Sequence, residues 1–246
     1  MPRPPATDAA LDLDDVLSGA AIDRTRAIAP QIYAALRARI IDNTLPPGAH
    51  LSESEIARSL GISRTPLRAA LQQLAGEGLL IIQPQVASVV APLDEGRLRE
   101  AVFVRIAIEE AVVRRLAGTG IDDAALAPVL ASQQVAAERD DYATFFVHDE
   151  TFHAMLAEQA GVPNAWGLVQ SMKAHVDRQR LRLTKSIPGR SLRAYRMHLA
   201  ILDHIRSGDG EAAARAMRDH INSVLDTPGV HDDSAGKTLE DALPAG

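Results

Sequence analysis

The chain of 246 residues contains no cysteine, few aromatic residues and no long apolar run. Without cysteine it forms neither a disulfide framework nor a thiolate metal cluster, so any metal site must use His, Asp or Glu. No segment approaches the ~20 apolar residues of a membrane span. The N-terminus lacks the basic-then-apolar order of a secretory signal. These absences predict a cytoplasmic protein with no membrane partner.

Aromatic side chains make up only 3% of the residues, and acidic residues outnumber basic ones to give a net charge of −6. This composition argues against an aromatic platform for single strands and against a pervasively basic nucleic-acid binder. Between Ile28 and Leu93, however, five arginines stand against four carboxylates. Any contact with nucleic acid must therefore be local, and this less acidic segment is the place to look for it.

Periodicity divides the chain at Pro92. Short helical patterns and β-branched runs precede it, whereas helical periodicity is nearly continuous after it. We expect a mainly α protein with an N-terminal domain at 27–93 and an all-α bundle at 94–228. Residues 1–26 and 229–246 lack periodicity and are typical of a flexible arm and tail. The bundle helices are predicted at 94–117, 122–138, 141–159, 163–185, 191–207 and 210–226.

The segment before Pro92 has the layout of a winged helix-turn-helix. After the helical stretch APQIYAALRARIID, the pair Ser52 and Glu55 forms a capping box at the start of a second helix. A tight turn after Gly61 then leads into a third helix, opened by Ser63. The run LLIIQPQVASVV predicts two short strands around a Pro-Gln turn, which would form the wing.

The helix opened by Ser63 has one face of leucines and, about 120° round, one polar face. In a helix-turn-helix, the first residues of the second helix meet base edges in the major groove, where arginine binds guanine bidentately. We therefore predict that Arg64 and Arg68 read bases and that Thr65 contacts a phosphate or a base. The predicted DNA-binding set is Arg64, Thr65, Arg68, Gln72, Ser63 and Ser52.

Three predicted bundle helices carry histidine on faces that should be apolar. These residues are His153, with Asp149 one turn before it, His198 and His220. A single such histidine is usually a core residue with a satisfied hydrogen bond. Four polar groups need partners, however, and one divalent ion would satisfy them all. Three nitrogens and one oxygen suit zinc, with nickel or manganese as alternatives.

Two stretches resemble a known family. LPPGAHLSESEIARSLGISRTPLRAALQQLAGEGLL is similar to the signature of the winged helix-turn-helix in GntR-family transcription regulators. Residues 97–224 resemble the FCD effector domain of the FadR-like subfamily, whose metal-binding members share the pattern D-x-x-F/L-H followed by two histidines. The resemblance implies that the positions of Arg64, Thr65 and Arg68 contact operator DNA. It also implies a metal that helps to bind a small carboxylate effector.

This sequence departs from the family pattern at two places. Ser54 stands where many members carry arginine, and the wing has Pro84, Gln85, Val86, Ala87 and Ser88 where many have glycine or basic residues. Fewer phosphates are then neutralised, so we expect modest affinity for the DNA backbone.

We therefore predict a one-component repressor that binds a palindromic double-stranded operator as a homodimer, with the first and fourth bundle helices as candidate dimer surfaces. A small organic acid at the metal site would control it. Arg105 lies on an inward stripe and is predicted to bind the effector carboxylate; the alternative is an i, i+4 ion pair with Glu109.

Two other functions are compatible with the same residues. The metal itself could be the signal. Alternatively, the chain could be a metal-dependent hydrolase or lyase with a DNA-binding appendage. Against the second, no clear general base accompanies the ligands, because Glu150 is turned about 100° from Asp149 on its helix. We expect no enzyme activity.

Overall fold

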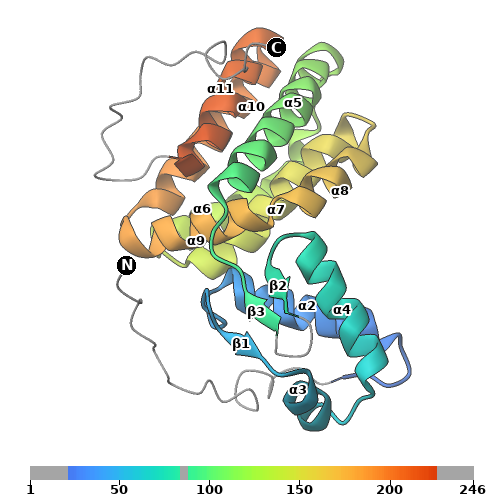
Figure 1. Cartoon of the computed structure of the whole chain (residues 1–246). Coiled ribbons are helices and arrows are strands. Elements are labelled where there is room, and N and C mark those ends of the chain that lie inside the picture. The colour runs from blue at the N-terminus through green and yellow to red at the C-terminus, as the bar shows by residue number, and fades with distance from the viewer. Residues whose placement is uncertain (1–21, 84–87, 226–246) are drawn as a thin grey trace, which may run out of the picture.

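The computed structural model describes residues 22–83 and 88–225 (Figure 1). The wing residues 84–87, most of the predicted arm and all of the predicted tail lie outside the described residues. The described chain forms an N-terminal unit of helices around a small sheet, and a larger helical bundle beside it. This is the mainly α architecture that the sequence predicts. No helix in the described part is both long and apolar enough to cross a membrane.

The N-terminal unit is a helix-turn-helix with a three-stranded sheet. Its strands pair antiparallel in the order β1-β3-β2, with Leu51 opposite Ser88 and Ile81 opposite Val89. The sequence predicts the two wing strands but not β1, because two residues are too few to show a period. The elements are α2 (Ile28–Ile41), β1 (His50–Leu51), α3 (Glu53–Ser59), α4 (Arg64–Gly76), β2 (Leu80–Ile82) and β3 (Ser88–Val90).

Several helices of both units have an acidic or hydroxyl side chain as their N-cap. The Ser52 hydroxyl accepts a hydrogen bond from the backbone N–H of Glu55, 3.4 Å away, which confirms the predicted cap of α3. Asp94, Asp122, Asp141 and Asp209 cap four bundle helices in the same way. Each carboxylate satisfies an N–H that has no partner inside its helix.

The bundle has one more helix than the sequence predicts. The expected helix 163–185 is divided in two near Lys173, and the expected helix 210–226 ends at Asn222 in a short 3₁₀ turn. The elements are α5 (Glu95–Thr119), α6 (Asp123–Glu138), α7 (Tyr142–Gln159), α8 (Pro163–Met172), α9 (Ala174–Ser186), α10 (Arg190–Arg206), α11 (Gly210–Asn222) and η1 (Ser223–Leu225).

The division near Lys173 has a tertiary cause, since neither Gly nor Pro lies there. The Lys173 side chain is buried between the carboxylates of Glu150 and Asp177. The next residue, Ala174, packs into the hydrophobic core of the N-terminal unit. Helix α9 thereby changes direction and becomes the element that docks the bundle onto the N-terminal unit.

Helix α9 also holds the segment that joins the two units. The buried Arg178 guanidinium donates to the carbonyl of Ala91 at 3.0 Å, and His175 Nδ1 accepts from the N–H of Asp94 at 3.3 Å. Because one helix contacts both the linker and the N-terminal core, movement of α9 would move the N-terminal unit.

The turn after α4 provides a test of this fold. Gly78 has φ +73°, and a Cβ there would lie 2.7 Å from Arg97 Nε, whereas a Cβ on Gly76 would meet nothing within 4 Å. We expect Gly78→Ala to lower the free energy of unfolding by at least ~1 kcal/mol. The matched Gly76→Ala should leave it unchanged or raise it by up to ~1 kcal/mol. Urea unfolding measures both; equal effects would contradict the described turn.

Candidate metal centre and nucleic-acid interface

The four predicted metal ligands come together in the centre of the bundle. Asp149 and His153 lie one turn apart on α7, while α10 supplies His198 and α11 supplies His220. One ligand atom from each residue lies within 4.8 Å of all the others, and all four side chains are buried. The i, i+4 spacing on α7 points both of its ligands toward the helices opposite.

The distances between these atoms suit a small divalent cation. His220 Nε2 lies 3.3 Å from His198 Nε2 and 3.3 Å from His153 Nε2, and His198 Nε2 lies 3.5 Å from Asp149 Oδ1. Tetrahedral zinc, with Zn–N bonds of ~2.0–2.1 Å, requires neighbouring nitrogens to be roughly 3.3–3.4 Å apart. The His220 nitrogen already has that spacing to each of the other two ring nitrogens.

Two further polar side chains orient the histidines. Glu109 Oε2 lies 2.5 Å from His153 Nδ1, and Gln133 Oε1 lies 2.9 Å from His198 Nδ1. Each contact turns the Nε2 atom of its ring toward the centre, as outer partners of metal-bound histidines do. Neither role is predicted from the sequence, although Gln133 is fully buried on the inner face of α6.

The site favours the protonation states that a cation needs. Burial lowers the pKa of His198 to about 3, and burial with the neighbouring rings of His198 and His153 lowers the pKa of His220 well below its ordinary value. Burial alone would raise the pKa of Asp149, but the Arg180 guanidinium, with the two nearest imidazoles, holds it well below the usual range. The centre therefore offers the neutral imidazoles of His198 and His220 and an ionised carboxylate at neutral pH.

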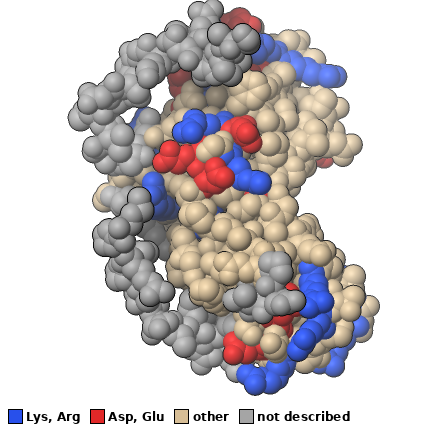
Figure 2. All heavy atoms as spheres, in the orientation of Figure 1, with Lys and Arg blue, Asp and Glu red and all other residues tan. Residues whose placement is uncertain are grey.

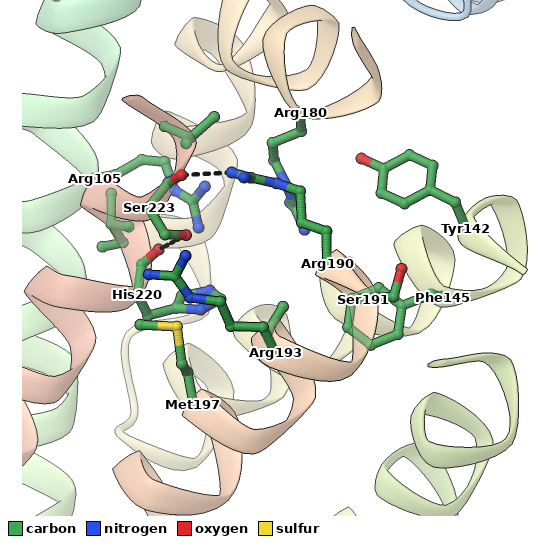
Figure 3. Close-up of a pocket in the computed structure, with 13 residues that line it drawn as sticks. Arg105, Tyr142, Phe145, Arg180, Arg190, Ser191, Arg193, Met197, His220 and Ser223 are labelled. Atoms are coloured by element: carbon green, nitrogen blue, oxygen red, sulfur yellow. Dashed lines mark hydrogen bonds between the residues drawn. The ribbon is translucent and has the colours of Figure 1, made fainter. Parts of the chain in front are cut away.

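A small cavity of about 30 Å³ adjoins His220, and Figure 3 shows arginines from α5, α9 and α10 around it. Its lining includes Arg105 and Ser191, which are both buried. Arg105 Nη2 and Ser191 Oγ make no hydrogen bond with any residue that the structure describes. Two buried donors without acceptors favour an anionic ligand, because such groups are costly to leave unpaired.

Arg105 takes part in both of the interactions considered for it. Its Nε donates to Glu109 Oε1 at 2.7 Å, so the i, i+4 ion pair is formed. The Nη2 atom belongs to the cavity wall. Glu109 in turn holds His153, so this ion pair links the cavity to a metal ligand.

The structure offers little support for hydrolytic chemistry. Glu150, the carboxylate nearest in sequence to the ligands, is engaged by Lys173 Nζ at 2.9 Å and faces Arg180 Nη1 at 3.9 Å. An oxygen that already faces two cations is not free to take a proton from a substrate as a general base.

The predicted DNA contacts lie on the exposed face of α4. Arg64, Thr65, Arg68 and Gln72 are all exposed, and basic side chains gather over α3 and α4 (Figure 2). Arg68 Nε donates to Glu53 Oε2 at 2.8 Å, which orients the guanidinium. The Ser63 side chain makes no capping hydrogen bond, whereas the Ser52 hydroxyl is used as a cap.

Comparison with known sequences agrees with both parts of this arrangement. Residues 28–90 match the profile described as "Bacterial regulatory proteins, gntR family", and residues 100–223 match the profile of the FCD domain. The chain belongs to the GntR family. GntR-family members with an FCD domain are transcription regulators rather than enzymes, as predicted.

Individual relatives support this assignment. The chain is 34% identical over 208 residues to the HTH-type transcriptional repressor RspR of Escherichia coli K12, covering 84% of this chain and 91% of that one. It is 32% identical over 203 residues to the "Probable D-xylose utilization operon transcriptional repressor" of Paenarthrobacter nicotinovorans, covering 80% and 87%. The solved structure of E. coli McbR/YncC has the same fold, with a TM-score of 0.66, 21% identity and coverage of 80% and 94%.

Because these histidines are buried, we expect the metal-free protein to lose stability against unfolding in acid. Below pH ~6.5 the unfolded chain binds a proton at His198, whereas the folded chain does so only near pH 3, so the free energy of unfolding falls as the pH drops. We expect a loss of ~1–3 kcal/mol between pH 7.5 and pH 5.5, measured by urea unfolding. His220→Gln should flatten this dependence. A wild-type stability that is unchanged over this range would contradict the buried, neutral state.

Proposed function

We propose that this GntR-family regulator is a repressor that binds a palindromic operator as a homodimer and releases it when a small carboxylate binds beside a metal in the bundle. One observation supports the proposal that an effector binds in the bundle. The ligand cluster opens onto a cavity where Arg105 and Ser191 present buried donors without acceptors among the described residues. Two of the relatives reported above are named repressors.

The operator would be read by α4. Its exposed N-terminal half carries Arg64 and Arg68 one turn apart, at the spacing needed to reach neighbouring base edges in the major groove. The ion pair with Glu53 holds Arg68 extended before DNA arrives. A pre-oriented guanidinium loses less rotamer entropy on binding guanine.

A second copy of the chain would cover the exposed apolar face of α5. Phe103 is 73% exposed there, and Ala107 and Ala111 follow it at one-turn intervals on the same exposed face. Leu168 on the adjacent α8 is 63% exposed. Large exposed apolar side chains over adjacent helices are typical of an interface, and twofold symmetry of the protein would match a palindromic operator.

The metal would be held by Asp149, His153, His198 and His220, and zinc suits the spacing of their ligand atoms. When bound, it would supply a Lewis-acidic centre that takes one carboxylate oxygen of the effector as a fifth ligand. Arg105 would bind the other oxygen, and Ser191 would donate from the opposite wall. The cavity has room for about one water, so an organic acid would enter by displacing arginine side chains from the lining.

The DNA-binding part can be tested with an operator selected from random duplexes. We expect two chains per selected duplex and a palindromic consensus. Arg64→Ala and Arg68→Ala should each weaken binding by ~1–3 kcal/mol and relax the preference at one base pair per half-site. Arg39→Ala on α2 is the matched control and should bind like the wild type. A complex with a single chain, or no sequence preference, would contradict the proposal.

The metal site can be followed through the only tryptophan in the chain. Trp166 stacks on the His153 ring, with centroids 5.5 Å apart and planes 10° apart. Adding zinc to chelator-treated protein should change the Trp166 emission and saturate near one equivalent, confirmed by elemental analysis. His198→Ala should weaken zinc binding by at least ~10-fold, whereas His204→Ala on the same helix should not. Equal zinc binding in the two variants would exclude this ligand set.

Operator release from the same zinc-loaded protein distinguishes an organic acid from the metal itself as the signal. A small carboxylate that releases the selected operator at constant zinc, and that loses its effect in Arg105→Gln, identifies the organic acid as the signal. Release that follows free zinc alone, with no response to any carboxylate, identifies the metal as the signal.

A further inference from the structure

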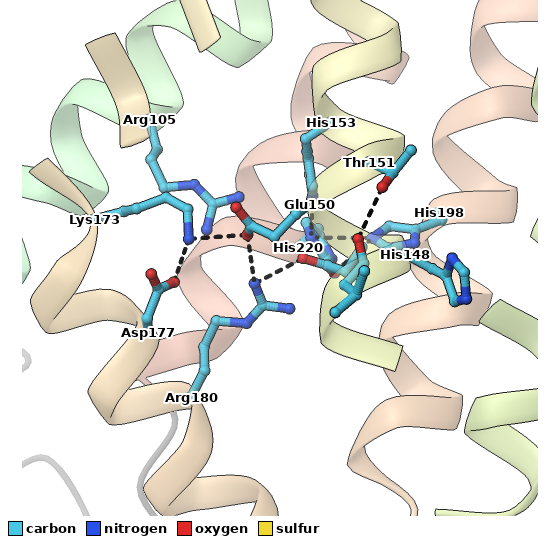
Figure 4. A network of polar contacts seen from close by, with 12 residues as sticks. Arg105, His148, Glu150, Thr151, His153, Lys173, Asp177, Arg180, His198 and His220 are labelled. Carbon is cyan, nitrogen blue, oxygen red and sulfur yellow. Dashed lines mark hydrogen bonds and ion pairs between the residues drawn. The ribbon is translucent and has the colours of Figure 1, made fainter. Parts of the chain in front are cut away.

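A chain of ion pairs leaves the metal centre from Asp149. Its Oδ2 atom lies 2.7 Å from Arg180 Nη1 on α9, away from the Oδ1 atom that faces His198. The same Arg180 nitrogen lies 3.9 Å from Glu150 Oε1, and Lys173 Nζ forms an ion pair with that oxygen at 2.9 Å. Figure 4 shows Glu150 between the two cations, with Asp177 beyond Lys173.

The series of ion pairs then crosses to the N-terminal unit, which carries the predicted DNA contacts. Lys173 Nζ donates to Asp177 Oδ1 at 2.5 Å, and Asp177 Oδ2 lies 3.9 Å from Arg37 Nη2 on α2. Arg37 Nε donates to Glu77 Oε2 at 3.1 Å, and the Tyr33 hydroxyl donates to the other oxygen of Glu77. Glu77 is the C-cap residue of α4, so the chain ends at the helix that carries Arg64 and Arg68.

The charges in this chain alternate without interruption. We call it the interdomain relay, and its members in order are Asp149, Arg180, Glu150, Lys173, Asp177, Arg37 and Glu77. The side chains of Lys173 and Asp177 are only 3% and 2% exposed. Charges in such surroundings interact more strongly and are screened less by salt than charges at the surface. A change at one member is therefore felt by its neighbours.

The surroundings of the relay leave its side chains room to move. A cleft of about 590 Å³ and another of about 440 Å³ lie between α2 and the bundle, and both are lined by Phe146 and Asp177. Lys173 Nζ and Arg180 Cζ lie 5.1 and 5.2 Å from the centre of the Phe146 ring. The relay thus runs along a loosely packed boundary rather than through a close-packed core.

We propose that the interdomain relay transmits occupancy of the metal and effector site to the recognition helix. This inference rests on the proposed function, because it requires ligands at that site. Arg180 is the input, since it pairs with the metal ligand Asp149 and also lines the effector cavity. Glu77 is the output. The residues between them act through their neighbours and are positioning residues.

Alternation of charge gives the relay a direction. When an anion in the cavity draws Arg180 toward itself, Arg180 moves away from Glu150. Glu150 then attracts Lys173 more strongly. Lys173 releases Asp177, which attracts Arg37, and Arg37 leaves Glu77. Helix α4 thereby loses one of the two contacts that hold its C-terminus to α2, the ion pair of Glu77 with Arg37, and keeps the hydrogen bond from Tyr33. A merely structural network would hold the two units together without responding to the site.

The experiment cuts the relay at two places and uses zinc as the probe. Asp177→Asn keeps the shape of the side chain but removes its charge, and Arg37→Met cuts the next link. Arg39→Met on the same helix, outside the relay, is the matched control. For each protein we would measure zinc binding through Trp166, amide hydrogen exchange over residues 70–80, and affinity for the selected operator with and without zinc.

In the wild type and in Arg39→Met, zinc should change operator affinity at least ~5-fold, the lower end of typical coupling between sites, because zinc on Asp149 weakens the ion pair of Asp149 with Arg180 even before an effector binds. It should also change exchange over residues 70–80. Both cut variants should bind zinc within about 3-fold of the wild type. Their zinc-dependent change in operator affinity should be less than about 2-fold, and the double variant should behave like each single one.

Two results would overturn the relay. The first is full zinc dependence of operator affinity in both cut variants. The second is a wild type in which Trp166 reports zinc but neither operator affinity nor exchange over residues 70–80 changes. A wild type without any Trp166 response or bound metal would instead refute the metal part of the proposed function, and would remove the input of the relay with it.

Discussion

The burial of Asp149 among three histidines is the constraint on which the rest of the structure depends. An ionised carboxylate inside a helical bundle is strongly destabilising unless cations surround it. Arg180 supplies a cation at one carboxylate oxygen, and His198 Nε2 lies 3.5 Å from the other. Because Arg180 must reach the centre from α9, the path of α9 is tied to the chemistry of the site.

That path explains why the predicted fourth helix is divided. A continuous helix from residue 163 would place its later residues along the axis of α8. The turn near Lys173 instead sends α9 against the N-terminal unit, where Ala174 enters the hydrophobic core and Arg178 binds the linker carbonyl of Ala91. One helix therefore serves both the buried cluster around Asp149 and the docking of the N-terminal unit.

The features that the sequence predicts well are those carried by local rules. The Ser52 cap, the leucine face of α4 and the inward histidines each follow from spacing within one helix. The division at Lys173, the strand β1 and the role of Gln133 depend on partners far away in the sequence. Gln133 meets His198 only because α6 and α10 pack together. No periodicity on α6 alone could reveal that contact.

An alternating chain of buried and partly buried charges suits a switch better than a single buried ion pair does. Removing one partner of a single pair leaves the other charge buried and alone, which typically costs 3–5 kcal/mol. In an alternating chain, a charge that leaves one neighbour approaches another, so every member between the two ends remains paired in both arrangements, and the terminal Glu77 keeps the hydrogen bond from Tyr33. The desolvation cost is then similar in the two arrangements and largely cancels in their difference. What remains is the free-energy difference that arises from the changed pair distances. This difference is small enough for a ligand with a coupling free energy of ~1–3 kcal/mol to control.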